Sequence, residues 1–111
     1  MRVVTTPHAA SYADPLAVRA GEAVVPGERD PQAPGWIWCV DPRGKGGWTP
    51  EGWLARCADG WVAARDYDSR ELSVAAGEVV EVLEEVAGWA WCRRTAGERG
   101  WVPVGKVGGG P

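Results

Sequence analysis

The sequence predicts an all-β protein made of two small β-barrels in tandem. Three observations support this prediction: an internal repeat, a high density of turn-forming residues, and side chains that alternate in character along short segments. The 111 residues include 16 glycines and 9 prolines, and 8 tryptophans carry most of the large apolar surface because phenylalanine is absent. A chain so rich in turn residues favours short strands over long helices.

The repeat is clearest around the tryptophans. Gly-Trp-Ile-Trp-Cys at residues 35–39 returns 53 residues later as Gly-Trp-Ala-Trp-Cys at residues 88–92. Each copy is followed by a Gly-Trp-x-Pro turn, at residues 47–50 and 100–103, with the same offset. A fixed spacing of this size indicates two copies of one small unit.

The repeat places the first unit at about residues 3–56 and the second at about residues 60–107. A further pair of segments, residues 16–22 and 72–78, recurs with an offset of 56 residues. The joint between the units, residues 57–60, is too short to act as a flexible tether. We therefore expect a limited range of mutual orientations.

Within each unit, successive side chains alternate as they do in β-strands, where neighbours point to opposite faces. Val80 and Val82 share one face of a predicted strand, and Glu81 lies on the other. Two further strands place small or branched residues on one face and indoles on the other: Ala90 and Cys92 against Trp89 and Trp91, and Ile37 and Cys39 against Trp36 and Trp38.

The net charge of −3 is unevenly spread along the chain. Residues 1–57 hold six basic and six acidic side chains, whereas residues 58–111 hold six basic and nine acidic ones. Nucleic-acid affinity comes mostly from phosphate neutralisation, so we expect no nucleic-acid partner. The second half should favour cationic partners. No apolar run approaches the length of a bilayer span, so we also expect no membrane partner.

Neither catalysis nor metal binding is predicted. His8 is the only imidazole, the cysteines lack close metal-ligand spacing, and no phosphate-binding glycine loop is present. We expect a non-enzyme without catalytic residues, metal or cofactor.

The N-terminus lacks the apolar core of a secretory signal, and Cys39 and Cys92 occupy equivalent repeat positions. A reduced, cytoplasmic chain is therefore expected.

Several motifs follow one another in the order of a known family. Ala-Ala-Arg-Asp-Tyr-Asp at residues 63–68, Glu-Leu-Ser-Val at 71–74, Gly-Glu at 77–78, Gly-Trp at 88–89 and Gly-Trp-Val-Pro at 100–103 resemble the motifs of SH3 domains. The first unit repeats the scheme from Tyr12 to Leu54. The resemblance covers nearly the whole chain. It implies two tandem SH3-like β-barrels and a non-catalytic module that binds peptides.

The resemblance also implies which residues form the peptide grooves. In the second unit they are Tyr67, Trp89 and Pro103, with Asp66, Asp68 and Glu71 in the loop that selects a basic ligand side chain. In the first unit they are Tyr12, Trp36, Pro50 and Trp53. Arg65 and Lys106 stand where the family usually has tyrosine. Aromatic side chains arranged in this way pack against the ridges of a proline-rich helix. The expected partner is therefore an extended proline-rich or basic peptide.

Two alternatives remain open. The tryptophans could instead pack over the barrels or close an interdomain or dimer interface, in a scaffolding protein that binds no peptide. Packing is the expected role of Trp48 and Trp101, whereas Trp38 and Trp91 suit either role. Recognition of cell-wall peptide or glycan is a third option.

Overall fold

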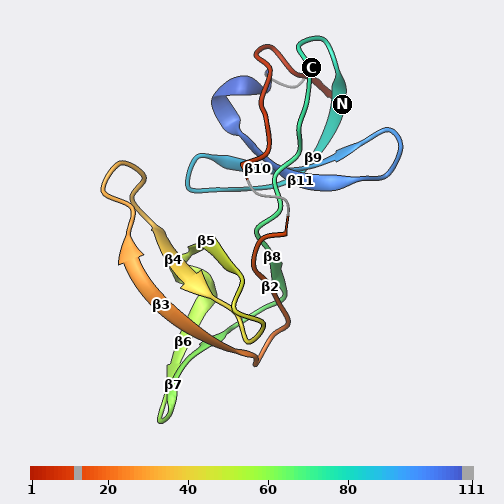
Figure 1. Ribbon diagram of the computed structural model, residues 1–111. Helices are drawn as coiled ribbons and strands as arrows, with labels where there is room; N and C mark the ends of the chain where they lie inside the picture. Colours follow the sequence, from red (N-terminus) through yellow and green to blue (C-terminus); the bar gives the residue numbers. More distant parts are fainter. Residues whose placement is uncertain (12–13, 109–111) are drawn as a thin grey trace. The chain divides into compact units, whose positions relative to one another are not determined.

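The computed structural model describes residues 1–11 and 14–108 (Figure 1). Its elements are short strands and two single 3₁₀ turns. The expected all-β class is confirmed, and these strands are consistent with a small SH3-like β-barrel fold. In the described residues no helix has the length and apolar character needed to cross a membrane. In chain order the elements are β1 (Arg2–Val3), β2 (Ala17–Val18), β3 (Ala23–Arg29), β4 (Trp36–Val40), β5 (Gly46–Pro50), η1 (Glu51–Trp53), β6 (Leu54–Cys57), β7 (Gly60–Ala63), β8 (Tyr67–Asp68), β9 (Val79–Val86), β10 (Trp89–Arg94), β11 (Arg99–Pro103) and η2 (Val104–Lys106).

The strands group into two compact units whose limits differ from the expected contiguous ones. Unit 1 combines Met1–Ala13 with Arg70–Pro111, and unit 2 is the continuous stretch Asp14–Ser69. The division at residues 3–56 and 60–107 therefore does not follow the strand pairing. Backbone pairing is the reason, because β1 pairs with β9, whereas β7 pairs with β3 and β6.

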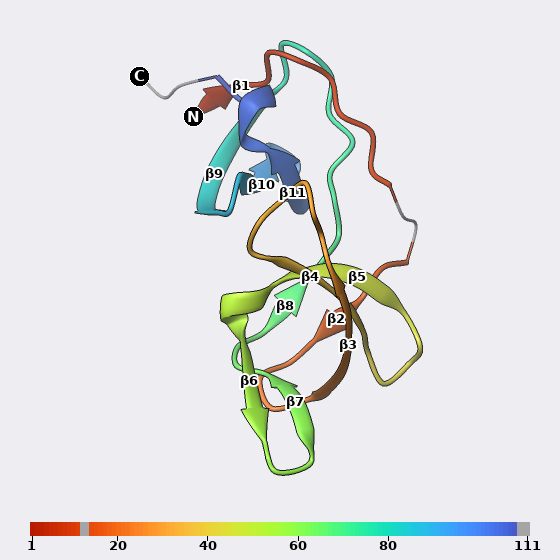
Figure 2. The ribbon, with the colours of Figure 1, turned by 90° about the vertical axis from the view of Figure 1, so that its left-hand side faces the viewer.

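Unit 1 contains an antiparallel sheet with the strand order β1-β9-β10-β11 (Figure 2). Small side chains of β10 face its core, as the alternation predicted: Ala90 is 1% and Cys92 0% exposed. Glu81 faces away and forms an ion pair with Arg93 on the neighbouring strand. The buried cluster consists of Val4, Leu72, Val74, Val80, Ala90, Cys92, Val102 and Val107, with Val82 and Val104 packed against it.

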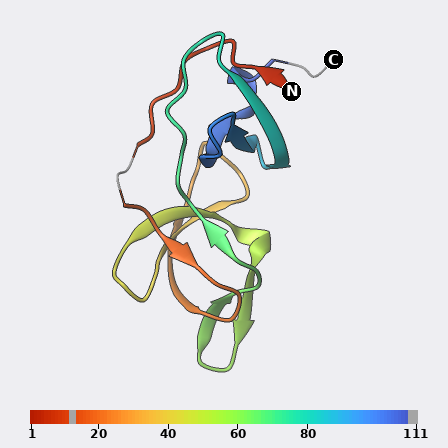
Figure 3. The ribbon, with the colours of Figure 1, turned by 90° about the vertical axis from the view of Figure 1, so that its right-hand side faces the viewer.

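Unit 2 contains a five-stranded sheet of order β5-β4-β3-β7-β6 and a small sheet that pairs β2 with β8 (Figure 3). Ile37 and Cys39 of β4 are buried, again as the alternation predicted. Other apolar side chains buried in this unit include Leu16, Val18, Val24 and Ala63.

Each unit carries a cross-strand tryptophan pair at the equivalent position. Trp38 lies opposite Trp48 with ring centroids 5.2 Å apart, and Trp91 lies opposite Trp101 at 5.1 Å. Aromatic pairs of this kind contribute about 0.5–1.5 kcal/mol beyond the area they bury. Trp101 is buried, so its expected packing role agrees with the structure.

The glycine before the second of each pair is needed because another segment approaches its backbone. A Cβ added at Gly100 would lie 2.7 Å from the backbone nitrogen of Leu72, and one at Gly47 would lie 2.4 Å from Ser69 Oγ. The absence of a Cβ at Gly100 lets the segment that contains Leu72 lie close to β11 in unit 1. The absence of a Cβ at Gly47 likewise lets the segment that contains Ser69 lie close to β5 in unit 2. The repeated Gly-Trp motif is thus a packing requirement.

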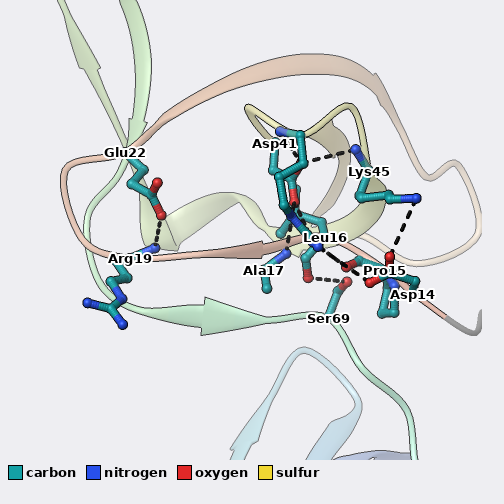
Figure 4. Close-up of polar contacts among 10 residues, drawn as sticks. Asp14, Pro15, Leu16, Ala17, Arg19, Glu22, Asp41, Lys45 and Ser69 are labelled. Atoms are coloured by element: carbon teal, nitrogen blue, oxygen red, sulfur yellow. Dashed lines mark hydrogen bonds and ion pairs between the residues drawn. The ribbon is translucent and has the colours of Figure 1, made fainter.

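Asp41 ties the start of β2 to the β4–β5 hairpin (Figure 4). Its carboxylate accepts hydrogen bonds from the backbone N–H groups of Ala17 (3.2 Å), Arg43 (2.9 Å) and Lys45 (3.0 Å). Burial raises the pKa of this carboxyl, but the backbone hydrogen bonds from Lys45 and Ala17 and the contacts of Arg43 outweigh it and hold the pKa below the ordinary 3.8.

Candidate functional site

Unit 1 has an aromatic cluster at one end of the β10–β11 hairpin. Trp89, the first residue of β10, lies directly opposite Pro103, the last residue of β11, and both side chains are half-buried. The imidazole of His8 packs edge-on against the Trp89 ring, with centroids 5.7 Å apart and planes at 78°. We call His8, Trp89 and Pro103 the unit 1 cluster.

The polar side of this cluster is built around the imidazole. His8 Nε2 lies 2.8 Å from Glu71 Oε1, and Lys106 Nζ lies 3.3 Å from His8 Nδ1. A lysine ammonium only donates, so Nδ1 accepts and the Nε2–H donates to the carboxylate. Ser11 Oγ donates a second hydrogen bond to Glu71, at 3.2 Å. Because the His8 and Glu71 side chains are only 10% and 14% exposed, this pair anchors residues 8–11 against the rest of unit 1.

Unit 2 has its own aromatic cluster. Tyr67 of β8 packs edge-on against Trp53 of η1, with centroids 5.5 Å apart, and its hydroxyl donates to the Trp48 carbonyl at 2.6 Å. The Arg65 guanidinium lies 3.7 Å from the centre of the Trp53 ring. A cation over an indole face at this distance is attractive by about 0.5–1 kcal/mol at an exposed site.

Trp36 lies opposite Pro50 in unit 2, as Trp89 lies opposite Pro103 in unit 1. Its environment differs, however, because Trp36 is only 4% exposed and Pro50 is also buried. Trp36 therefore does not present an open ring in the described structure, and its role in ligand contact stays a prediction.

The three acidic residues expected to select a basic ligand are divided between the units. Asp66 Oδ1 accepts a hydrogen bond from the backbone N–H of Ala20 at 2.9 Å, and Asp68 lies half-buried in β8 opposite Ala17. Both belong to unit 2, whereas Glu71 belongs to unit 1 and contacts His8. The expected acidic loop is therefore not a single patch in either unit.

The structure regroups the predicted groove residues across the repeats. Tyr67 packs against Trp53 of the first repeat, and Tyr12 lies outside the described residues. His8 was not among the predicted site residues, although the structure places it against Trp89. Aligning the N-terminal residues with residues 63–67 at an offset of 59 would have placed His8 at the position of Tyr67.

The thiols are chemically distinct. Cys39 and Cys92 are free and buried, and Cys57 is free and exposed. Burial raises the pKa of the Cys92 thiol to about 11 and also raises that of Cys39. Within residues 1–11 and 14–108, no three His, Cys, Asp or Glu side chains are grouped closely enough to hold a metal ion.

In the comparison with protein families, residues 58–107 match the family model of the variant SH3 domain. Domains of this type are protein-interaction modules that bind peptide or protein ligands and are generally non-catalytic. The comparisons with curated proteins and with solved structures give no significant match. The matched stretch crosses the boundary between the units: its first residues, up to Ser69, belong to unit 2, and the rest belongs to unit 1.

Proposed function

We propose that this protein is a non-catalytic interaction module that binds extended, proline-rich or basic peptide segments through the unit 1 cluster. One observation carries the proposal. In the stretch that matches a variant SH3 domain, a half-buried Trp89 lies opposite Pro103 with the edge of the His8 ring against it. Three flat or rigid side chains at the end of one hairpin form the walls that a ridged peptide needs.

The chemistry of the cluster suits a proline-rich ligand. A proline helix loses little conformational entropy on binding, and its exposed carbonyls accept hydrogen bonds from an indole N–H. One cluster of this size contributes a few kcal/mol at most, as interface hot spots do. We therefore expect dissociation constants in the micromolar range or weaker.

Charge favours a basic residue in the ligand. Unit 2 holds nine acidic and six basic side chains in residues 14–69, so it carries a charge of −3, whereas the six acidic and six basic side chains of unit 1 balance. This field should raise the association rate of cationic peptides at low ionic strength. A cytoplasmic location is part of the same proposal, supported by the three free thiols.

The test is a titration of the full chain with a proline-rich peptide of about ten residues, with and without a central arginine, followed by amide and indole NMR. We expect shifts at the Trp89 indole and at the amides of Val102 and Val104. Trp89→Ala should weaken binding at least about tenfold. Trp61→Ala is the matched control, because this half-buried indole lies against Arg56 in the β6–β7 hairpin, outside the cluster.

Two results would contradict the proposal. One is equal affinity of the Trp89→Ala and Trp61→Ala variants for the peptide. The other is the absence of any shift across the peptide panel. Sedimentation equilibrium then separates the remaining roles, since a dimer in that case supports the scaffolding alternative.

A further inference from the structure

Two segments of the chain occupy equivalent places, one in each unit. We call residues 1–11 the N-terminal closing segment and residues 60–69 the central closing segment. Each segment pairs with the other strands of its unit, and those other strands come from one copy of the sequence repeat. The N-terminal segment completes residues 70–108 of unit 1, and the central segment completes the rest of unit 2.

The backbone hydrogen bonds that hold the N-terminal closing segment in unit 1 include three that recur in unit 2. Val4 N–H donates to the Glu78 carbonyl at 2.8 Å, and the Val4 carbonyl accepts from Gly77 N–H at 2.7 Å. Thr5 N–H donates to the Lys106 carbonyl at 2.8 Å.

The central closing segment makes the same three bonds in unit 2. Ala63 N–H donates to the Glu22 carbonyl at 2.9 Å, and the Ala63 carbonyl accepts from Gly21 N–H at 2.7 Å. Ala64 N–H donates to the Trp53 carbonyl at 2.9 Å. The acceptors and donors on the receiving side are repeat equivalents of those in unit 1, with the offsets of 56 and 53 found in the sequence.

The bridges at both ends of the segments agree as well. Val4 pairs with Val107 as Ala63 pairs with Leu54, and His8 pairs with Val74 as Tyr67 pairs with Val18. Both segments thus follow one register with a constant offset of 59 between them. Val4 and Ala63 are both apolar and buried, so each fits the same position.

We propose that the two closing segments are interchangeable. The chain then has a second closure, in which residues 60–69 complete residues 70–108 and residues 1–11 complete residues 14–57. Backbone hydrogen bonds depend on register and direction and not on side-chain identity, so each receiving edge accepts either segment. The second closure keeps every one of these backbone bonds.

Side chains decide which closure is more populated. In the present one His8 contacts Glu71 and Lys106, while Tyr67 contacts Trp53 and the Trp48 carbonyl. Exchange would place the phenol of Tyr67 beside Trp89 and the imidazole beside Trp53. The backbone pairing is common to both closures and therefore cancels in the free-energy difference between them. Only the difference between these few side-chain contacts remains, and so both closures are accessible.

Disulfide trapping in the full chain tests the proposal. In a Cys57→Ser background, Val4→Cys with Val107→Cys reports the present closure, and Ala63→Cys with Val107→Cys reports the second one. Val107 is the repeat equivalent of Leu54, so the second closure places Ala63 opposite it. Directly opposed residues of antiparallel strands have Cα atoms about 4.5–5.5 Å apart, within the range that a disulfide spans.

The control is Ala64→Cys with Val107→Cys, since the next residue along a strand points to the other face. In a glutathione redox buffer the first pair should close fast and within one chain. The Ala63 pair should close more slowly, but at least about tenfold faster than the Ala64 control, a ratio that corresponds to 1.4 kcal/mol. A disulfide between two copies in the Ala63 pair also supports interchangeability, by exchange between chains.

Failure of the Ala63 pair to outpace the control would overturn the proposal, and so would failure of the Val4 pair to close at all. Amide hydrogen exchange of the unmodified chain gives a second measurement. Interconversion releases both segments together, so the Val4 and Ala63 amides should exchange at one rate, at least tenfold faster than the amides of Ile37 and Ala90, which lie in strands that neither segment pairs with. Exchange of all four amides at the same rate would contradict it.

Discussion

Replacing Asp41 by alanine should destabilise unit 2 by about 2–4 kcal/mol. The Asp41 side chain is 0% exposed, and its carboxylate accepts from three backbone N–H groups and from the Arg43 guanidinium at 3.0 Å. The substitution leaves these donors without their charged acceptor. Hydrogen bonds to a charged group contribute about 1.5–3 kcal/mol each, but neighbouring bonds in one network do not add.

The loss should depend on pH with a defined sign. The pKa of Asp41 is lowered on folding, because the hydrogen bonds from Lys45, Ala17 and Arg43 together outweigh burial, which alone would raise it. A lowered folded pKa means that the ionised carboxylate stabilises the fold fully above the unfolded pKa of about 3.9. The stabilisation is lost as the pH falls through the folded value. The difference between wild type and Asp41→Ala should therefore be largest near neutral pH and shrink in acid.

Urea unfolding followed by tryptophan fluorescence measures this difference, and amide exchange at Ala17 and Lys45 assigns it to unit 2. Asp59→Ala is the matched control, because this carboxylate is exposed in the turn of the β6–β7 hairpin. A loss below about 0.5 kcal/mol for Asp41→Ala, the usual range for exposed sites, would refute the reasoning. An equal loss at pH 7 and at pH 2 would refute the assigned cause.

Three further results are expected. Gly100→Ala should lower the stability of unit 1 by about 1–3 kcal/mol in the same urea assay, since its Cβ would lie 2.7 Å from the Leu72 nitrogen; unchanged stability would contradict the close approach. With a thiol reagent at pH 8, exposed Cys57 should react first, whereas Cys92, with a pKa of about 11, should react only after unfolding. If the proposed function holds, His8→Ala should weaken peptide binding several-fold in the NMR titration and His8→Tyr should restore it; wild-type affinity in the alanine variant would remove His8 from the site.

Local patterns predicted the strands and their inward faces. The alternation around Ala90 and Cys92 placed both side chains in the core, and the repeated Gly-Trp-x-Pro motif marked a strand that ends at a rigid turn. The register of Trp89 opposite Pro103 follows from a single hairpin, so short-range sequence was enough to bring these two residues of the predicted groove together.

Sequence patterns alone were sufficient to predict the all-β class and the repeated set of strands, because both follow from short-range spacing and alternation. The sequence did not show which closing segment pairs with the strands of which unit. Val4 and Ala63 make the same backbone bonds to repeat-equivalent partners, so no local motif distinguishes their destinations. The distinction depends on contacts between residues far apart in the chain, such as His8 with Glu71 and Tyr67 with Trp53, and such contacts form only once the barrels close.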